Sequence, residues 1–347
     1  MVESAQSAVA GGEHTIYRSP TGHLFSAGAC GLGWCRNLPT SLSLFGFRRV
    51  ASISEPVRLF HAGYYHNLAV GASSGKLYSW GCGTFCDGGL DGSIPAFGRG
   101  VHAEDVGGPP EVVPMEDGEG AGVVGMAGGA YHSAVLLQSG RILTFGAGQL
   151  GQLARSPRHV DQSGLPVDAD PAPAEGLPPS ETATGIGGGF YNTFARCKSG
   201  KLFCSGENQN QQCGRGQSNF HRFSHVKEVS NVAGVSGGYC HTLVRTLDGV
   251  IYSLGCGDDG QRGDGKLEVD EEESGEPMAG RPVVSKVPLP GNKRADAVAA
   301  GANHSVVLSS DGVAYTFGAN DVGQCGVPNY TTTTTLVRVL LGINNTR

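Results

Sequence analysis

A glycine spacing that recurs six times along the 347-residue chain limits the folds that it can adopt. In each copy a glycine stands three residues before a histidine or asparagine, a second glycine follows, and a third comes six residues after the second. The copies start near residues 11, 63, 129, 189, 238 and 301. Units of 49 to 66 residues are typical of an array in which each unit packs on its neighbours.

Each copy predicts a β-hairpin. In the third copy two apolar runs, residues 134–137 and 141–145, flank Ser139-Gly140. A two-residue loop ending in glycine favours a tight hairpin turn, because glycine adopts positive φ at little cost. A lone hairpin cannot bury its apolar face in water, so the copies must pack against one another.

Further strands are predicted between the hairpins. Proline-bearing runs such as Glu55–Gly63 and Arg281–Leu289 bring each repeat to three or four short strands, which matches a propeller blade. The first copy lacks such a run, whereas a strand-like segment, 334–343, follows the last hairpin. We therefore expect an all-β propeller that forms a single domain over 1–347. It would have six blades, with seven as the alternative, in a ring closed by the N- and C-terminal strands.

Three inserts interrupt the repeats, and we expect all of them to be solvated loops. They cover residues 91–125, 156–185 and 264–280. The last insert carries an acidic run that is either an ordinary solvated loop or a docking site for a basic partner. The residues of this run are Asp270, Glu271, Glu272 and Glu273.

Composition narrows the classes of function. Glycine supplies 57 residues, about twice its usual share of about 7%, as a β fold with many tight turns requires. The net charge of −6 argues against direct nucleic-acid binding. No secretory signal and no stretch of 18 apolar residues is found, so we expect no membrane insertion. The ten cysteines are therefore interpreted as reduced thiols of a cytoplasmic or nuclear protein that is not secreted.

The last copy, from Ala300, reads AGANHSVVLSSDGVAYTFGANDVGQCG. Its combination of Gly-x-x-His, Asp-Gly turn, aromatic-Gly and Gly-Gln-x-Gly resembles the repeat of the regulator-of-chromosome-condensation propeller family. The likeness covers about residues 10–341. Two features depart from the family pattern, because familiar members have seven blades and because Asn192 replaces the usual histidine.

The resemblance implies several activities. The founding member is an exchange factor for the Ran GTPase and carries a basic tail, which this sequence does not show before its first repeat. The related plant ultraviolet-B photoreceptor uses a tryptophan cluster, whereas only Trp34 and Trp80 occur here. Ubiquitin-ligase members carry a further catalytic domain, for which these residues leave no room. A guanine-nucleotide exchange factor for a small Ran-like GTPase is therefore kept as the alternative function.

The histidines and cysteines do not predict a catalytic or metal site. A residue that recurs once per repeat is expected to be structural, satisfying buried polar groups between strands. These positions are His14, His66, His132, Asn192, His241 and His304. Cys82 and Cys86 have zinc-like spacing, but no second ligand pair accompanies them, so neither a metal nor a cofactor is expected.

One pattern does indicate a binding site. The two residues between the first glycine and the histidine of each copy are aromatic in six of twelve cases, against 7% for the whole chain. They are Tyr64, Tyr65, Tyr131, Phe190, Tyr191 and Tyr239. These rings either pack between blades or form an aromatic surface suited to protein recognition. We therefore predict a non-enzymatic interaction scaffold, a subunit or adaptor whose partners are other proteins, among them a small GTPase or a multi-subunit complex.

Overall fold

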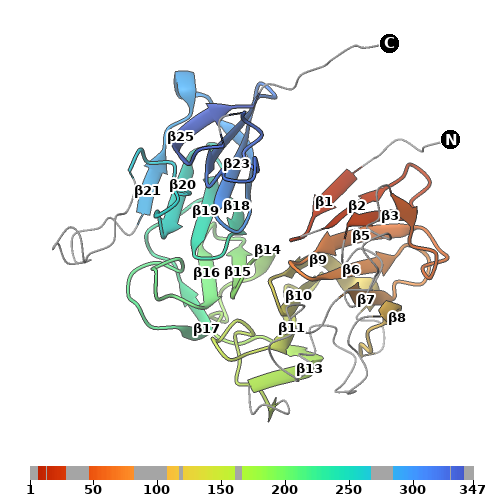
Figure 1. Cartoon of the computed structure of the whole chain (residues 1–347). Helices are drawn as coiled ribbons and strands as arrows, with labels where there is room; N and C mark the ends of the chain where they lie inside the picture. The colour runs from red at the N-terminus through yellow and green to blue at the C-terminus, as the bar shows by residue number, and fades with distance from the viewer. Residues whose placement is uncertain are drawn as a thin grey trace, which may run out of the picture. The chain divides into compact units, whose positions relative to one another are not determined.

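The computed structural model is built from antiparallel β-sheets (Figure 1). It describes residues 7–12, 14–28, 47–81, 108–116, 120–160, 166–266, 284–328 and 330–339. Within these ranges the strands form six sheets, one for each repeat of the sequence. The predicted all-β fold and its count of six repeats are confirmed.

The chain divides into two compact units, and the first contains the first three sheets and most of the fourth. The first two sheets consist of β1 (Ser7–Ala10), β2 (His14–Arg18), β3 (Leu24–Gly28) and β4 (Arg48–Arg49), then β5 (Val57–Ala62), β6 (His66–Gly71), β7 (Leu77–Gly81) and β8 (Gly108–Val112). The next two consist of β9 (Val123–Gly128), β10 (His132–Leu137), β11 (Ile142–Ala147), β12 (His159–Val160) and β13 (Pro166–Pro173), then β14 (Ala183–Gly189), β15 (Asn192–Cys197), β16 (Leu202–Gly206) and β17 (Phe220–His225).

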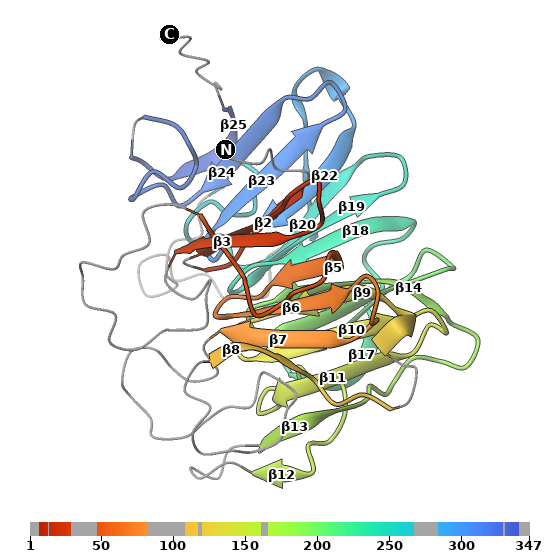
Figure 2. The same ribbon diagram turned by 90° about the vertical axis from the view of Figure 1, so that its right-hand side faces the viewer.

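The second unit contains the fifth and sixth sheets. Their strands are β18 (Val232–Gly237), β19 (His241–Thr246), β20 (Ile251–Gly255) and β21 (Val284–Val287), then β22 (Ala295–Ala300), β23 (His304–Ser309), β24 (Ala314–Gly318) and β25 (Thr333–Arg338). In both units each strand pairs with its neighbour in sequence, except in the third sheet, where β13 inserts between β11 and β12. Figure 2 shows this order for β6, β7 and β8.

Successive sheets within a unit pack face to face around apolar cores. The innermost strands β5, β9 and β14 lie side by side in the first unit. Leu68 and Leu77 of the second sheet meet Val135 and Phe145 of the third in one buried cluster. The apolar core is therefore divided into clusters between successive sheets, from the first and second to the third and fourth in the first unit, and between the fifth and sixth in the second unit.

The register explains the constant six-residue gap between the second and third glycines. The third glycine lies directly opposite the repeat histidine, as Gly81 lies opposite His66. Gly81 has φ of 122°, and a Cβ there would come within 2.7 Å of the Tyr65 carbonyl oxygen. The constant distance between the two glycines therefore places one in the tight turn and the other where the backbone of the paired strand comes too close for a side chain.

The first glycine of the motif makes room for the histidine ring. At Gly129 an added Cβ would lie 2.3 Å from both His132 Cε1 and the Gly189 carbonyl oxygen. We expect Gly129→Ala to lower the free energy of unfolding by about 1–3 kcal/mol, because backbone must shift to accept the methyl group. Urea denaturation would measure this. Gly122→Ala is the matched control, since its Cβ would meet nothing within 4 Å, and an equal loss in both variants would contradict the packing explanation.

The two terminal strands do not share a sheet, contrary to the expected closure. The N-terminal strand β1 pairs with β2, and the C-terminal strand β25 pairs with β24, each within its own repeat. Both strands pair with their neighbours in sequence, because closing the short connection between neighbouring strands costs less entropy than closing a loop that spans the whole chain. The segment Ser7–Ala10 is thus the first strand of the first sheet, which sequence inspection had not recognised.

The second and first inserts are not simple loops. Residues 156–185 contain β12, the eight-residue strand β13 and the start of β14, and residues 91–125 contain β8. β13 pairs with β11 on one side and with β12 on the other. The prediction of solvated loops is therefore wrong for these parts. Within 264–280, residues 267–280 lie outside the described residues, and so does the acidic run Asp270–Glu273.

The prediction of reduced thiols is wrong for Cys240 and Cys256, and also for Cys204 and Cys213, which are disulfide-bonded too. Cys240 and Cys256 form a disulfide, with their Cα atoms 5.6 Å apart. His241 lies opposite Gly255 in the β19–β20 hairpin, so the residues just outside this pair face each other. Cys197 and Cys325 are buried. The sequence places Cys240 and Cys256 in different motif positions, and only the strand register brings them together.

Candidate functional site

The repeat histidines connect neighbouring sheets through buried hydrogen bonds. The Nε2 atom of His66 lies 2.7 Å from Ser133 Oγ in the next sheet, and that of His132 lies 3.0 Å from Thr193 Oγ1. In the second unit, His241 Nε2 lies 3.0 Å from Ser305 Oγ. Each partner directly follows the repeat position of the next sheet, which is a histidine before Ser133 and Ser305 and Asn192 before Thr193.

The hydrogen-bond directions fix the histidine tautomer. Thr193 Oγ1 donates to the Gln152 carbonyl oxygen at 2.7 Å, so it must accept from the Nε2–H of His132. The Nδ1 atoms of His66, His132 and His241 are buried and have no hydrogen-bond partner in the described structure. A second proton would therefore be placed on a nitrogen without an acceptor, and these imidazoles are held neutral.

Burial lowers the pKa values of these histidines far below the usual 6.5. The pKa falls to about 4 for His132, mainly because burial penalises the charged ring. The pKa of His66 falls to about 3, through burial first and then through the neighbouring histidine His132. Neutral rings that are almost fully buried cannot contact a substrate, so their geometry fits the structural role that the sequence predicts.

Asn192 makes different hydrogen bonds from the histidines that it replaces. Its side-chain Nδ2 donates to the carbonyl oxygen of Glu207 at 2.7 Å, beyond the end of β16 in its own sheet. The shorter side chain therefore ties the first and last residues of one hairpin together. His304 is the least buried of the repeat histidines, and burial lowers its pKa as well.

Five of the six predicted aromatic residues gather in one cluster of the first unit, which we call the aromatic cluster. Its members are Tyr64, Tyr65, Tyr131, Phe190 and Tyr191, packed on Ala130, Ala147 and Val167. Backbone hydrogen bonds position the segments, since Tyr64 donates to the Gly129 carbonyl oxygen at 2.9 Å and Ala130 donates to that of Phe190 at 3.0 Å. The backbone just before the repeat histidine of the second sheet is therefore hydrogen-bonded to the corresponding backbone of the third sheet, and that of the third sheet to that of the fourth.

The rings of the aromatic cluster meet mostly edge to face. Tyr64 lies 4.6 Å from Tyr65 and 4.8 Å from Phe190, measured between ring centroids. Phe190 lies 4.8 Å from Tyr191 in the same arrangement, whereas Tyr65 stacks on Tyr131 at 5.3 Å. Such pairs are favourable beyond the area they bury, so the cluster is a preformed apolar surface rather than a set of loose side chains.

The members of the aromatic cluster differ in exposure. Tyr131 is only 2% exposed, so it supports the other rings from beneath and does not itself present a ring to a partner. Tyr64, Tyr65, Phe190 and Tyr191 are half-buried. Tyr239, 46% exposed, belongs to the second unit and is not a member of the cluster. Tyr131 therefore packs between sheets, whereas the other four rings of the cluster are partly exposed.

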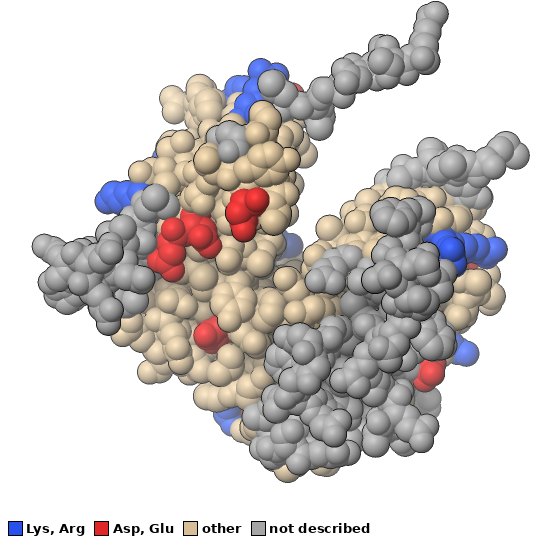
Figure 3. Space-filling model, in the orientation of Figure 1, with Lys and Arg blue, Asp and Glu red and all other residues tan. Residues whose placement is uncertain are grey.

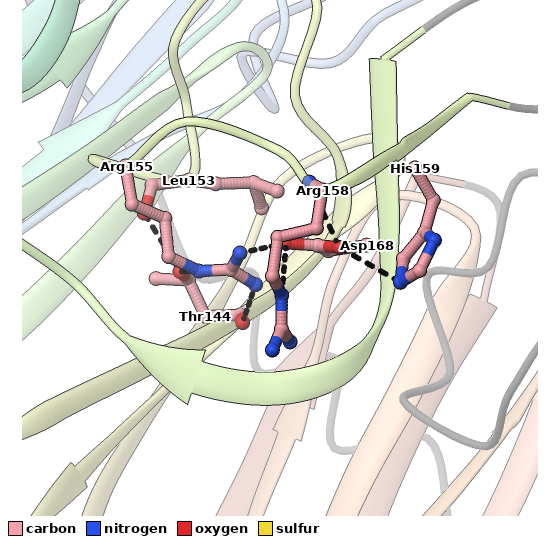
Figure 4. Close-up of polar contacts among 6 residues, drawn as sticks. All are labelled: Thr144, Leu153, Arg155, Arg158, His159 and Asp168. Atoms are coloured by element: carbon pink, nitrogen blue, oxygen red, sulfur yellow. Dashed lines mark hydrogen bonds and ion pairs between the residues drawn. The ribbon is translucent and has the colours of Figure 1, made fainter.

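A buried ion pair stabilises the third sheet close to this cluster (Figure 4). The guanidinium of Arg155 donates to the fully buried carboxylate of Asp168, and also to the Thr144 carbonyl oxygen at 2.8 Å. Arg158 and His159 approach the same carboxylate from the exposed side, at 3.6 and 3.9 Å. Burial lowers the pKa of Arg155 to about 10. The set links Asp168 of β13 to Thr144 of β11 through Arg155.

The part of the chain that the structure describes contains neither a metal-binding cluster nor a membrane-spanning helix. No group of three or more His, Cys, Asp or Glu side chains there could hold a metal ion. No helix there is long and apolar enough to cross a bilayer. On the face in Figure 3, acidic side chains stand in small groups and most Lys and Arg lie at its margins. Cys82 and Cys86 lie outside the described residues.

Sequence reasoning missed the partners of the histidines, although a signal was present. The residue after the repeat position is small and polar in every copy. These residues are Thr15, Asn67, Ser133, Thr193, Thr242 and Ser305. The Arg155–Asp168 pair left no comparable signal, because it occurs in a single repeat.

Comparison with known proteins agrees with this architecture. The model of the regulator of chromosome condensation (RCC1) repeat matches residues 248–308, and a second model of that repeat matches residues 295–324. The mouse regulator of chromosome condensation is 27% identical over 94% of this chain and 75% of its own length. A crystal structure of Prp20p from Saccharomyces cerevisiae matches with a TM-score of 0.77 and 24% identity, covering 97% of this chain and 77% of that one. The chain is an RCC1-repeat β-propeller.

A further relative is much larger than this chain. The human E3 ubiquitin-protein ligase HERC2 is 30% identical over 271 residues, which is 76% of this chain and only 5% of HERC2. An RCC1-repeat propeller can therefore be a small part of a long protein. Since one fold serves many activities, function has to be argued from the site.

Proposed function

We propose that the chain is a non-enzymatic platform for protein–protein interaction and that the aromatic cluster is its contact surface. The observation that carries this proposal is the gathering of four half-buried aromatic rings on a fully buried Tyr131 base. Rigid aromatic rings give large contact area at low entropic cost and dominate many interfaces. A nuclear or cytoplasmic location, as a subunit or adaptor, is part of the same proposal.

The test truncates two of the half-buried rings and leaves the buried Tyr131 beneath them unchanged. We expect Tyr64→Ala combined with Tyr191→Ala to reduce recovery of specific partners at least tenfold in affinity purification with mass spectrometry, because two half-buried contact residues are truncated. Tyr131 is left intact so that the sheet remains packed. Tyr330→Ala, which truncates a tyrosine that is 66% exposed elsewhere, should recover every partner. A double variant that is folded by circular dichroism and keeps all partners would disprove the contact surface.

Guanine-nucleotide exchange is the alternative function. It is supported by similarity to the mouse regulator of chromosome condensation, and by the Prp20p study, which describes binding to Gsp1p and histones. No catalytic constellation in the described residues adds to it. Release of a fluorescent guanine nucleotide from Ran at micromolar concentrations of this chain decides between the two. A scaffold leaves the release rate unchanged, and acceleration would replace the scaffold proposal by exchange activity.

A further inference from the structure

The disulfide between Cys240 and Cys256 joins an accessible cysteine to a buried one. Cys240 directly precedes the repeat histidine of its sheet and is half-buried, whereas Cys256, just beyond β20, is only 5% exposed. Cys204 and Cys213, which are also disulfide-bonded, are both buried. A disulfide is exchanged when a thiolate reaches one of its sulfurs, so the rate depends on access. Of these four cysteines, Cys240 is the one best placed to meet a thiol from solution.

The β19–β20 hairpin does not need this disulfide for its geometry. The N–H of Cys256 donates to the Cys240 carbonyl oxygen at 3.0 Å. The same backbone hydrogen bond closes the equivalent hairpins of the third, fourth and sixth sheets at 2.8, 3.1 and 2.9 Å, where no two cysteines stand at these positions. The residue pairs there are Tyr131 and Ala147, Tyr191 and Glu207, and Asn303 and Ala319. We therefore expect the reduced hairpin to keep its register, so that the disulfide can open and close without unfolding.

A buried amide donates to the sulfur of Cys256. The Nε2 atom of Gln261 lies 3.1 Å from Cys256 Sγ. The Oε1 atom of the same side chain accepts from the Asp259 N–H at 2.8 Å, which fixes the direction of the amide. In the third and fourth repeats the equivalent glutamines, Gln152 and Gln212, hold the same turn through Oε1, but their Nε2 atoms are buried and have no partner among the described residues. Of these three repeats, only the fifth directs this amide at a sulfur.

We propose that Cys240 and Cys256 form a reversible thiol–disulfide exchange site whose substrate is a dithiol reductant. A thiolate of the reductant attacks Cys240 Sγ and forms a mixed disulfide, while the bond to Cys256 breaks and its electron pair leaves on Cys256 Sγ. The Gln261 amide then donates to a thiolate. Hydrogen bonding to the charged form favours that form, so the amide makes Cys256 a better leaving group.

The second thiolate of the reductant completes the reaction. It attacks the reductant sulfur of the mixed disulfide, which releases Cys240 as a thiolate and leaves the reductant as an internal disulfide. Two electrons thus pass from the dithiol to the protein, and each cysteine sulfur can take up a proton from water. A small disulfide such as oxidised glutathione reverses the reaction through a mixed disulfide at Cys240.

The exchange site is separate from the proposed contact surface. All members of the aromatic cluster belong to the first unit, whereas Cys240, Cys256 and Gln261 belong to the second. Tyr239, which precedes Cys240, is 46% exposed, so the chain is open to solvent at this point. The inference therefore goes beyond the proposed function and does not depend on it.

The test treats the native full chain with dithiothreitol without denaturant, stops the reaction with acid at successive times, and alkylates free thiols after unfolding. Peptide mass spectrometry then gives the reduced fraction of each cysteine. Cys240 and Cys256 should be reduced about tenfold faster than Cys204 and Cys213, because exchange follows access. The circular dichroism spectrum should stay unchanged, and oxidised glutathione should restore the bond. Equal rates for the four cysteines, or reduction only on unfolding, would overturn the exchange site.

A matched pair of variants tests the amide. Gln261→Leu removes the donor to sulfur and should slow reduction of the Cys240–Cys256 bond about tenfold, because Cys256 becomes a poorer leaving group. Gln152→Leu removes the equivalent amide of the third repeat, together with the same hydrogen bond to the turn, and should leave this rate unchanged. Equal rates in the two variants would overturn the role given to Gln261.

Single-cysteine variants identify the attacked sulfur. With oxidised glutathione, Cys256→Ser should form a mixed disulfide at Cys240, detected as an increase in intact mass. Cys240→Ser leaves only the buried Cys256 of the pair and should form this adduct about tenfold more slowly, because a buried sulfur is poorly reached. An adduct that forms faster at Cys256 than at Cys240 would overturn the proposed direction of attack.

Discussion

Replacing Asp168 by asparagine is expected to lower the free energy of unfolding by about 3–5 kcal/mol, the largest effect of any single substitution proposed here. The carboxylate is fully buried, and the guanidinium that it neutralises, that of Arg155, is only 4% exposed. Asparagine leaves this cation buried without a counterion, and the penalty is the uncompensated charge rather than the lost attraction. Chemical denaturation at pH 7 would measure the loss.

Two comparisons make the Asp168 prediction specific. Asp170→Asn changes an exposed carboxylate two residues along the same strand and should stay within about 0.5 kcal/mol of the native protein. Replacing Arg155 by methionine together with Asp168 by leucine removes both charges and should restore most of the lost stability. A loss below about 1 kcal/mol for Asp168→Asn would mean that the pair is hydrated and does not anchor β13.

Acid is expected to destabilise the fold steeply between pH 6.5 and about 4. The pKa values of His66 and His241 fall to about 3 in the folded chain, and that of His132 to about 4, mainly through burial. Below pH 6.5 the unfolded chain binds protons that the folded chain rejects, so stability that is complete above pH 6.5 is lost as the pH falls. At pH 5 each histidine costs about 2 kcal/mol, and three together approach the stability of a typical domain.

The acid prediction is tested by removing one proton-binding site at a time. His132→Asn, which copies the residue that the chain itself uses at position 192, should be less stable than the native protein at pH 7.5. Its unfolding free energy should also decline less steeply with acid, by about 1.4 kcal/mol per pH unit below pH 6. His221→Gln, at an exposed position, should leave the slope unchanged. Identical slopes for all three proteins would show that these histidines are protonated in the folded state.

The repeat pattern predicted most of the fold because each element depends on local residues. The spacing of Gly63, His66, Gly75 and Gly81 already contains the turn, the ring packing and the register of the β6–β7 hairpin. The six aromatic positions were likewise found from their place in the repeat, and five of them meet in one cluster. Which rings reach the surface could not be predicted, because Tyr131 packs against rings from the two neighbouring repeats, Tyr65 and Phe190.

The wrong predictions for the β13 segment and for the cysteines share a physical cause. β13, with the sequence PVDADPAP, has three prolines and two aspartates, a composition that favours a loop. It is a strand because Arg155 neutralises Asp168 and β11 supplies pairing partners, and both are tertiary effects. The disulfide between Cys240 and Cys256 also follows from strand register.

The direction of the histidine hydrogen bonds has a consequence for how such chains evolve. His132 donates forward to Thr193, while the adjacent Ser133 lies against the histidine of the preceding sheet. In the second and third repeats, two consecutive residues therefore supply the hydrogen-bond donor to the next sheet and the partner for the histidine of the previous sheet. A tandem duplication of such a repeat carries both the histidine and the polar residue that follows it. The new sheet can then bond to the sheets on either side without a compensating mutation. Blade number in such a lineage can thus grow by gene duplication alone, while surface loops diverge freely.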